Sequence, residues 1–319
     1  MARPLPVSIL TGFLGSGKTT LLSRLLGHPR MGETAVIVNE LGEVAIDHHL
    51  LRRVDERTVV LASGCVCCTL RGDLADELRD LLDRRTRREL PPFRRVVLET
   101  TGLADPGPIL STLVSEPMLR HQFAVEAVVT TVDAVAGLET GRRRREWAQQ
   151  AAAADRLVVT KGDLAGRARV DALCEELGRI NPAADVLEVA FGAVDPRRLF
   201  GGRCKLAGRA AAQVDHAHTD VVRSFALELD RPLDWAAFGV WLTMLLQSRG
   251  VDILRVKGLL NTGGPGPVLV NGVQHVVYPP EHLPRWPDGD RRSRLVFIAR
   301  DVEPGALRAS LEAFAALRG

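Results

Sequence analysis

The residues with the clearest chemical purpose lie near the start of the chain. Residues 12–19 spell GFLGSGKT, which matches the spacing G-x-x-x-x-G-K-[ST] between an apolar run and a helical pattern. Glycines in such a loop let backbone N–H groups point at an anion, while the lysine and threonine serve phosphate oxygens and Mg²⁺. The segment therefore predicts a polyphosphate site, made of Gly12, Gly15, Ser16, Gly17, Lys18, Thr19 and Thr20.

A second group of polar residues follows another apolar run, Val96–Leu98. It spells ETTG and starts with Glu99. An acid that ends a buried strand beside a phosphate loop can hold Mg²⁺ through a water molecule, and Gly102 is placed to sense the γ-phosphate. Most proteins with this kind of loop have Asp at the position of Glu99. We predict Lys18, Thr19 and Glu99 as the catalytic residues.

A third group suggests which base is bound. Residues 160–163 spell TKGD, similar to the N-K-x-D pattern of GTPases with Thr160 in place of Asn. Guanine presents two donors, its N1–H and its exocyclic amine, and the carboxylate of Asp163 could accept both. The aliphatic stem of Lys161 can pack over the base. Guanine preference is expected, although the Thr substitution leaves its strictness open.

Three of the five cysteines fall within four residues, at Cys65, Cys67 and Cys68. Thiolates bind soft or borderline ions such as Zn²⁺ and Co²⁺, and three of them supply most of a tetrahedral site. Two other interpretations stay open: small buried side chains, or a redox-active thiol pair. Candidates for a fourth ligand lie in the preceding segment, at Glu40, Glu43, Asp47, His48 and His49. His216 and His218 form a short H-x-H that could pass metal along, although solvated linker histidines explain it more simply, and Cys174 and Cys204 are expected to have no required role.

The elements that must position these residues follow an alternating pattern. Apolar runs alternate with helical stretches up to about residue 200, which predicts an α/β domain with a mainly parallel sheet. Its expected strands are Leu5–Leu10, Thr34–Asn39, Thr58–Ala62, Arg94–Thr100, Ala127–Val132 and Arg156–Thr160. Its expected helices include Lys18–Leu26, Leu70–Arg88, Trp147–Ala154 and Val170–Ile180.

The pattern changes after residue 200. Residues 201–219 lack periodicity and are predicted to be a linker between a 1–200 phosphate-loop domain and a smaller 220–319 α+β domain. The expected strands of the second domain are Phe225–Leu229, Ile253–Leu260, Pro267–Val270, Val273–Tyr278 and Leu295–Ala299. Its expected helices are Asp234–Arg249 and Pro304–Leu317.

Composition limits the partners and the compartment. A net charge of +3 over 319 residues argues against a nucleic-acid binder, which concentrates basic charge. No stretch approaches the roughly 20 apolar residues of a membrane span, and the N-terminus lacks a signal-peptide pattern. Clustered, odd-numbered cysteines suit metal binding in a reducing compartment better than disulfides, so we expect a cytoplasmic protein.

Taken together, the motifs resemble those of the CobW-type family of P-loop GTPases, which includes cobalamin-synthesis CobW proteins and related metallochaperones. The shared segments are GFLGSGKTT at 12–20, NELGEVAID at 39–47, GCVCC at 64–68, ETTGLADP at 99–106 and TKGD at 160–163. The resemblance implies slow GTP hydrolysis, Zn²⁺ or Co²⁺ bound by the cysteines, and delivery of metal to a client metalloprotein. It also implies that Glu43 joins Thr19 and Glu99 around Mg²⁺.

Two other functions fit parts of the sequence. A P-loop kinase for a small molecule would need an arginine-rich lid, and the candidates for one are the runs Arg84–Arg88 and Arg142–Arg145. Solvated helix faces explain these runs more simply. A non-catalytic zinc buffer would bind metal regardless of nucleotide.

Overall fold

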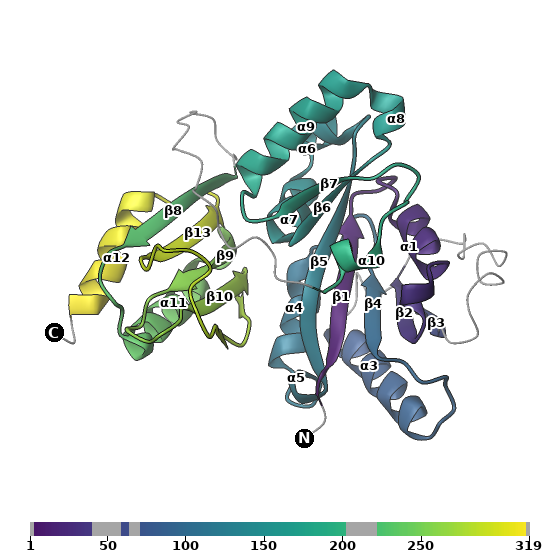
Figure 1. The fold of residues 1–319 in the computed structure, drawn as a ribbon, viewed down its shortest axis with the longest axis horizontal. Coiled ribbons are helices and arrows are strands. Elements are labelled where there is room, and N and C mark those ends of the chain that lie inside the picture. Colours follow the sequence, from purple (N-terminus) through teal and green to yellow (C-terminus); the bar gives the residue numbers. More distant parts are fainter. Residues whose placement is uncertain (1–2, 40–58, 64–70, 202–221, 317–319) are drawn as a thin grey trace. The chain divides into compact units, whose positions relative to one another are not determined.

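The computed structural model describes residues 3–39, 59–63, 71–201 and 222–316 (Figure 1). These residues form two compact units, one built mainly from the chain up to residue 203 and the other mainly from the chain beyond it. Within the described ranges, no helix is long and apolar enough to cross a membrane. The predicted linker at 201–219 lies outside the described residues apart from Gly201, so that boundary stays a prediction.

The N-terminal unit is built on a seven-stranded sheet in which every pairing is parallel. The strand order is β3-β2-β4-β1-β5-β6-β7, so β1 lies at the centre (Figure 1). The strands are β1 Leu5–Gly12, β2 Thr34–Asn39, β3 Val59–Ser63, β4 Arg95–Glu99, β5 Phe123–Asp133, β6 Arg156–Thr160 and β7 Asp185–Glu188. This confirms the α/β fold class with a parallel sheet.

Helices join the strands and bury the sheet. They are α1 Lys18–Leu26, the 3-10 turn η1 Pro29–Met31, α3 Arg71–Thr86, α4 Pro106–Ser115, α5 Leu119–Gln122, α6 Gly137–Arg143, α7 Arg145–Ala153, α8 Gly162–Ala165, α9 Arg167–Ile180 and α10 Pro196–Leu199. One core joins Leu21 and Leu25 of α1 to Leu10, Val97 and Val129 of the sheet, all with at most 1% exposure. Such packing explains why the strands are apolar throughout rather than alternating.

The parallel register brings the ends of the central strands to one edge of the sheet. Leu10 of β1 pairs with Glu99 of β4, and Gly12 pairs with Thr131 of β5. In open α/β sheets, ligands bind beyond the carboxyl ends of the strands, where the chain connections diverge. The three predicted motifs of this unit all follow strands that end at this edge.

The C-terminal unit contains an antiparallel sheet with two helices. The main strand order is β11-β10-β9-β13-β8, and β12 also pairs with β10. The elements are β8 Arg223–Leu229, α11 Trp235–Arg249, β9 Ile253–Leu260, β10 Val268–Val273, β11 Val276–Val277, β12 Glu281–His282, β13 Ser293–Ala299 and α12 Pro304–Ala316. Aliphatic side chains make up most of its core, within which Phe297 stacks on Phe225 and packs nearly perpendicular to the ring of Trp241.

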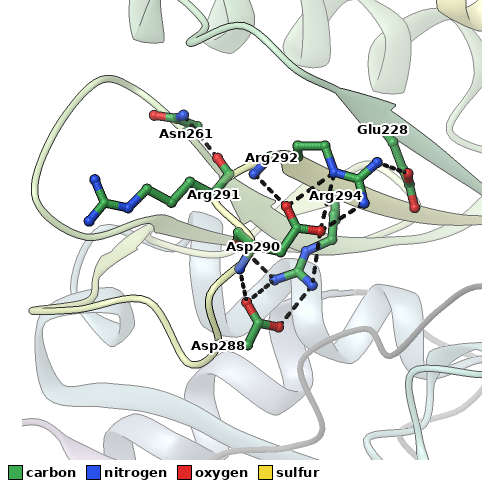
Figure 2. A network of polar contacts seen from close by, with 7 residues as sticks. All are labelled: Glu228, Asn261, Asp288, Asp290, Arg291, Arg292 and Arg294. Atoms are coloured by element: carbon green, nitrogen blue, oxygen red, sulfur yellow. Dashed lines mark hydrogen bonds and ion pairs between the residues drawn. The ribbon is translucent and has the colours of Figure 1, made fainter.

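An ion-pair network fastens the segment that leads into β13, as Figure 2 shows. Arg292 binds Asp290 at 2.8 Å and Glu228 of β8 at 2.7 Å. Arg294 binds both carboxylate oxygens of Asp288, at 2.9 and 3.0 Å. These arginines hold the pKa values of Asp288 and Asp290 below the ordinary range for aspartate. The network therefore ties the irregular segment 285–292 to the sheet edge.

Several predicted elements differ in extent: the strand expected at Ala127–Val132 is the longer β5, and the strand expected at Pro267–Val270 is β10, which continues to Val273. The expected strand Val273–Tyr278 is instead a tight hairpin, in which Val273 ends β10 and pairs with Val276 of β11. Gln274, which has a positive φ of 52°, and His275 form the two-residue turn. A residue with this backbone conformation cannot continue a strand, and the run of valines on both sides hid the turn.

Candidate nucleotide site

The phosphate loop begins where β1 ends, and its backbone requires glycine. Gly12 has φ 139°, and a Cβ there would lie 2.3 Å from the hydroxyl and 2.4 Å from the carbonyl oxygen of Thr131. Gly17 adopts the left-handed conformation, φ 92° and ψ 20°, directly before the first residue of α1. Gly15 also has a positive φ, 72°. These conformations turn the chain sharply enough to aim the start of α1 at the loop, which suits an anion.

The first residues of α1 carry the expected phosphate-binding groups. Lys18 is 9% exposed, and its Nζ donates to the carbonyl oxygens of Gly12, at 2.9 Å, and Phe13, at 3.4 Å. The amine therefore lies across the loop that would surround the phosphates. Thr19 and Thr20 follow in the first turn of the helix, and Thr20 is exposed.

Thr19 and Glu99 meet although they are 80 positions apart in the sequence. The hydroxyl of Thr19 donates to Oε1 of Glu99 at 3.0 Å, and Glu99 is only 4% exposed at the end of β4. A hydroxyl and a carboxylate are hard oxygen ligands of the kind that Mg²⁺ prefers. The donor set fits Mg²⁺, and these are the residues that would hold it.

The segment after Glu99 packs against the tip of the phosphate loop. A Cβ on Gly102 would lie 2.6 Å from the backbone nitrogen of Leu14, so the two backbones are in close contact. Gln150 of α7, only 1% exposed, donates to the carbonyl oxygens of Gly102, at 3.2 Å, and Ala104, at 3.0 Å. No sequence pattern pointed to Gln150, which holds this segment from a position 48 residues after Gly102.

Ser16 is held in place by hydroxyls from two neighbouring strands. Its Oγ lies 2.6 Å from Oγ1 of Thr131, and its carbonyl oxygen accepts a hydrogen bond from Thr160 at 2.7 Å. Thr160 replaces the Asn of N-K-x-D, and its hydroxyl makes a direct link between the base motif and the phosphate loop. Thr131, at the end of β5, is a second residue of the site that the sequence patterns did not identify.

Lys161 and Asp163 extend from the end of β6. Lys161 has a positive φ of 57°, an uncommon conformation for a non-glycine residue, and its Nζ pairs with Asp133 at 2.7 Å. Asp163 lies in the short helix α8 and is exposed. The ion pair fixes the lysine stem, and the carboxylate of Asp163 is accessible to a ligand.

Several predicted residues lie outside the described part of the chain. They are the possible Mg²⁺ ligand Glu43, the cysteines Cys65, Cys67 and Cys68, the other acidic and histidine candidates between residues 40 and 49, and Cys204, His216 and His218. Among the residues that the structure does describe, no group of three or more His, Cys, Asp or Glu side chains is placed to hold a metal ion. Cys174 on α9 is half-buried, and burial raises the pKa of its thiol. It is therefore a poor metal ligand.

Arginines of both runs pair with acidic residues of their own helices. Arg142 and Arg143 are largely exposed and both pair with Glu139 of their own helix. Arg84 pairs with Asp80, one turn earlier on α3. These are solvated helix faces with local ion pairs.

Two models of known protein families match the chain. Residues 6–188 match the family model described as CobW/HypB/UreG, nucleotide-binding domain, and residues 222–315 match the cobalamin synthesis protein cobW C-terminal domain. The chain is 36% identical to the zinc chaperone YjiA of Escherichia coli strain K12, over 99% of both chains.

Two further matches extend the comparison. The solved structure of the Zn(II)-bound YjiA GTPase from E. coli superposes with a TM-score of 0.75 at 32% identity, covering 98% of this chain and 99% of that one. A zinc-regulated GTPase metalloprotein activator of Schizosaccharomyces pombe is 31% identical over 60% of this chain and 47% of its own length. The family resemblance seen in the motifs is thereby confirmed, and the chain belongs to the CobW family of P-loop GTPases.

Proposed function

We propose that this protein is a GTP-hydrolysing metallochaperone that binds Zn²⁺ or Co²⁺ through Cys65, Cys67 and Cys68 and delivers it to a client metalloprotein in the cytosol. The observation that carries the proposal is the contact between Thr19 and Glu99, 3.0 Å, at the carboxyl edge of the sheet. The cysteine segment starts from this same edge, because β3 ends at Ser63, two residues before Cys65.

The strand register supports coupling between nucleotide and metal. Val38 of β2 pairs with Glu99 of β4, and Asn39 of β2 pairs with Ser63 of β3. The chain between β2 and β3 contains Glu43, which by family resemblance joins Thr19 and Glu99 around Mg²⁺. A change at the phosphate site can therefore pass through hydrogen-bonded neighbouring strands to both segments, the one that carries Glu43 and the one that carries the cysteines.

The hydrolytic cycle assigns a task to each residue of the site. Lys18 exchanges the carbonyl oxygens of Gly12 and Phe13 for oxygens of the β- and γ-phosphates. Gly102, whose backbone touches the tip of the loop, senses whether the γ-phosphate is present. Asp163 accepts the two guanine donors. Mg²⁺, when bound, neutralises charge on the phosphates, and Thr19, Glu99 and Glu43 would hold it.

In the proposed switch, GTP orders the 39–50 segment and the cysteine loop into a tight metal site. Hydrolysis to GDP and phosphate removes the γ-phosphate contact, so the metal site loosens and the ion passes to a docked client. Coupling of this kind is reciprocal, so the metal must tighten GTP binding by the same factor.

The test is the affinity of the purified protein for Zn²⁺ and for Co²⁺, measured by competition with a chelator. It is measured with Mg²⁺ and a non-hydrolysable GTP analogue, and again with GDP. We expect at least tenfold tighter binding of one metal with the analogue, which corresponds to about 1.4 kcal/mol of coupling. Equal affinities in the two states would indicate a zinc buffer and would refute the switch.

Variants separate the cysteine site from the rest of the protein. Replacing Cys67 and Cys68 together by Ser should abolish the coupling and leave GTP binding in place. Cys174→Ser is the matched control, because this thiol is half-buried on α9 and has a raised pKa. Unchanged coupling in the double variant would show that the metal binds elsewhere.

A further inference from the structure

An exposed aromatic residue with an uncommon backbone conformation follows the strand beside the base motif. Phe191 is 68% exposed, although most large apolar side chains of this unit are buried. Its φ is 52°, in the left-handed region, where a bulky side chain is a genuine outlier. Strain of this kind costs of order 1–3 kcal/mol and is concentrated at ligand sites.

The turn that presents Phe191 is well anchored. The N–H of Ala193 donates to the carbonyl oxygen of Ala190 at 3.0 Å, and the two central residues, Phe191 and Gly192, both have positive φ. Such a turn favours Asn, Asp or Gly at its first central position, so phenylalanine is an unexpected choice. A Cβ on Gly192 would lie 3.1 Å from the carbonyl oxygen of Thr20, which places the turn against α1.

Contacts on both sides hold the turn still. Val189 before it is 5% exposed, and its N–H donates to the carbonyl oxygen of Val159 in β6 at 2.9 Å. Asp195 after it caps α10 by accepting from the N–H of Arg197 at 3.0 Å, and it pairs with Arg30. The exposure of Phe191 is therefore built into a fixed turn rather than arising at a loose loop tip.

The position of this turn matches that of the base motif. β6 and β7 are parallel neighbours, and Val159 pairs with Glu188. Lys161 directly follows β6 with φ 57°, and Phe191 lies three residues after the end of β7 with φ 52°, so the loops that leave two adjacent strands at the same edge each contain a bulky residue with positive φ. The backbone of Gly192 also contacts the helix that begins with Lys18 and Thr19.

We propose that the ring of Phe191 stacks on the guanine base, which would lie between this ring and the aliphatic stem of Lys161. The inference rests on the guanine-nucleotide binding of the proposed function and adds a residue that stacks on the flat face of the base. Asp163 recognises hydrogen-bond donors at the edge of the base, whereas Phe191 contributes affinity for any purine ring. The strained turn fixes the position of the ring before the nucleotide binds, so little conformational entropy is lost on binding.

The test uses the full-length chain without added zinc and measures affinity for GDP, inosine diphosphate and pyrophosphate by calorimetry. Phe191→Asn removes the ring, and Asn tolerates the left-handed conformation, so the melting temperature should not fall. Base–aromatic stacking is strong enough that we expect GDP and inosine diphosphate to bind about tenfold more weakly, by similar factors. Pyrophosphate, which has no base, should bind as it does to the wild type.

Two more variants complete the design. Phe191→Trp should keep GDP affinity, and emission from the introduced indole should change when GDP binds. Met118→Asn is the matched control, because Met118 is also exposed, at 42%, and lies at the opposite edge of the sheet. It precedes α5, which leads into β5, and the first residue of β5 pairs with the first residue of β1. This control should leave all three affinities unchanged.

The outcomes are distinct. GDP binding by Phe191→Asn within twofold of the wild type would overturn the stacking role, as would an equal loss for pyrophosphate together with a lower melting temperature. A silent indole in Phe191→Trp would also contradict it. None of these results bears on the coupling between GTP and zinc, whereas a wild-type protein that binds no GDP would end the proposed function itself.

Discussion

The link between Thr160 and the phosphate loop offers a sharp test of how the site is built. Thr160→Val removes one hydroxyl and keeps the shape of the side chain. In the wild type this hydroxyl donates to the carbonyl oxygen of Ser16 at 2.7 Å, and the residue is 7% exposed. The carbonyl oxygen of Val132 lies farther away, at 3.3 Å, so Ser16 is the main partner.

The size of the effect follows from burial. A buried carbonyl group that loses its hydrogen-bond partner destabilises a protein by about 1–3 kcal/mol. Ser16 has a second tie through Thr131, at 2.6 Å, so the loop should loosen rather than collapse. We expect the free energy of unfolding to fall by about 1–2 kcal/mol. If about 1 kcal/mol of the binding free energy of GDP is spent on ordering the loosened loop in the variant, GDP affinity falls about fivefold.

Denaturant unfolding and calorimetry with GDP measure the two quantities separately. Thr112→Val is the matched control, because Thr112 is also 7% exposed and its hydroxyl donates to a backbone carbonyl oxygen, that of Pro108 at 3.1 Å within α4. The control should lose stability without losing affinity. If Thr160→Val binds GDP as tightly as Thr112→Val, then the hydroxyl of Thr160 does not support the phosphate loop.

Three other outcomes can be stated from the structure. Gly102→Ala would place a Cβ 2.6 Å from the backbone nitrogen of Leu14 and force the two backbones apart. GTP turnover should therefore fall at least tenfold in a steady-state phosphate-release assay, and a normal rate would contradict the close contact. Asp288 and Asp290 have folded pKa values below their unfolded values of about 3.9, so their charged forms stabilise the C-terminal unit above that pH. This stability should be lost as pH falls from about 4 towards 2, measured by tryptophan fluorescence, and the loss should be less steep in Asp290→Asn. Cys174, whose thiol pKa is raised by burial, should react with iodoacetamide more slowly at pH 8 than a model thiol, and equal rates would show that it is not shielded.

Most of the fold was accessible from the sequence because its elements are strongly patterned. The helix Lys18–Leu26 and the strands Thr34–Asn39, Arg156–Thr160 and Ile253–Leu260 have the predicted bounds. Strand β7, Asp185–Glu188, was missed because its four residues include two acids and it lies at the sheet edge. Helix α4 was missed because it starts with PGP, although Asp105 caps it by accepting from the N–H of Gly107.

The candidate site was predictable only where chemistry follows local spacing. The residue types of GFLGSGKT identify a phosphate loop without any knowledge of the fold. Thr131, Asp133 and Gln150 could not be found in this way, because their partners lie on other elements and are set by the sheet register and by helix packing. The positive φ of Phe191 is equally hidden, since its side-chain type argues against that conformation.

The two hydrogen bonds of Ser16 also affect how the protein folds while it is being synthesised. Thr131 follows Ser16 by 115 positions and Thr160 follows it by 144, so the phosphate loop leaves the ribosome before both partners and cannot reach its final geometry until β6 is in place. Parallel sheets with such distant pairings fold slowly. Capture of nucleotide would therefore mark completion of nearly the whole N-terminal unit, and a chain truncated before residue 160 should not retain GDP.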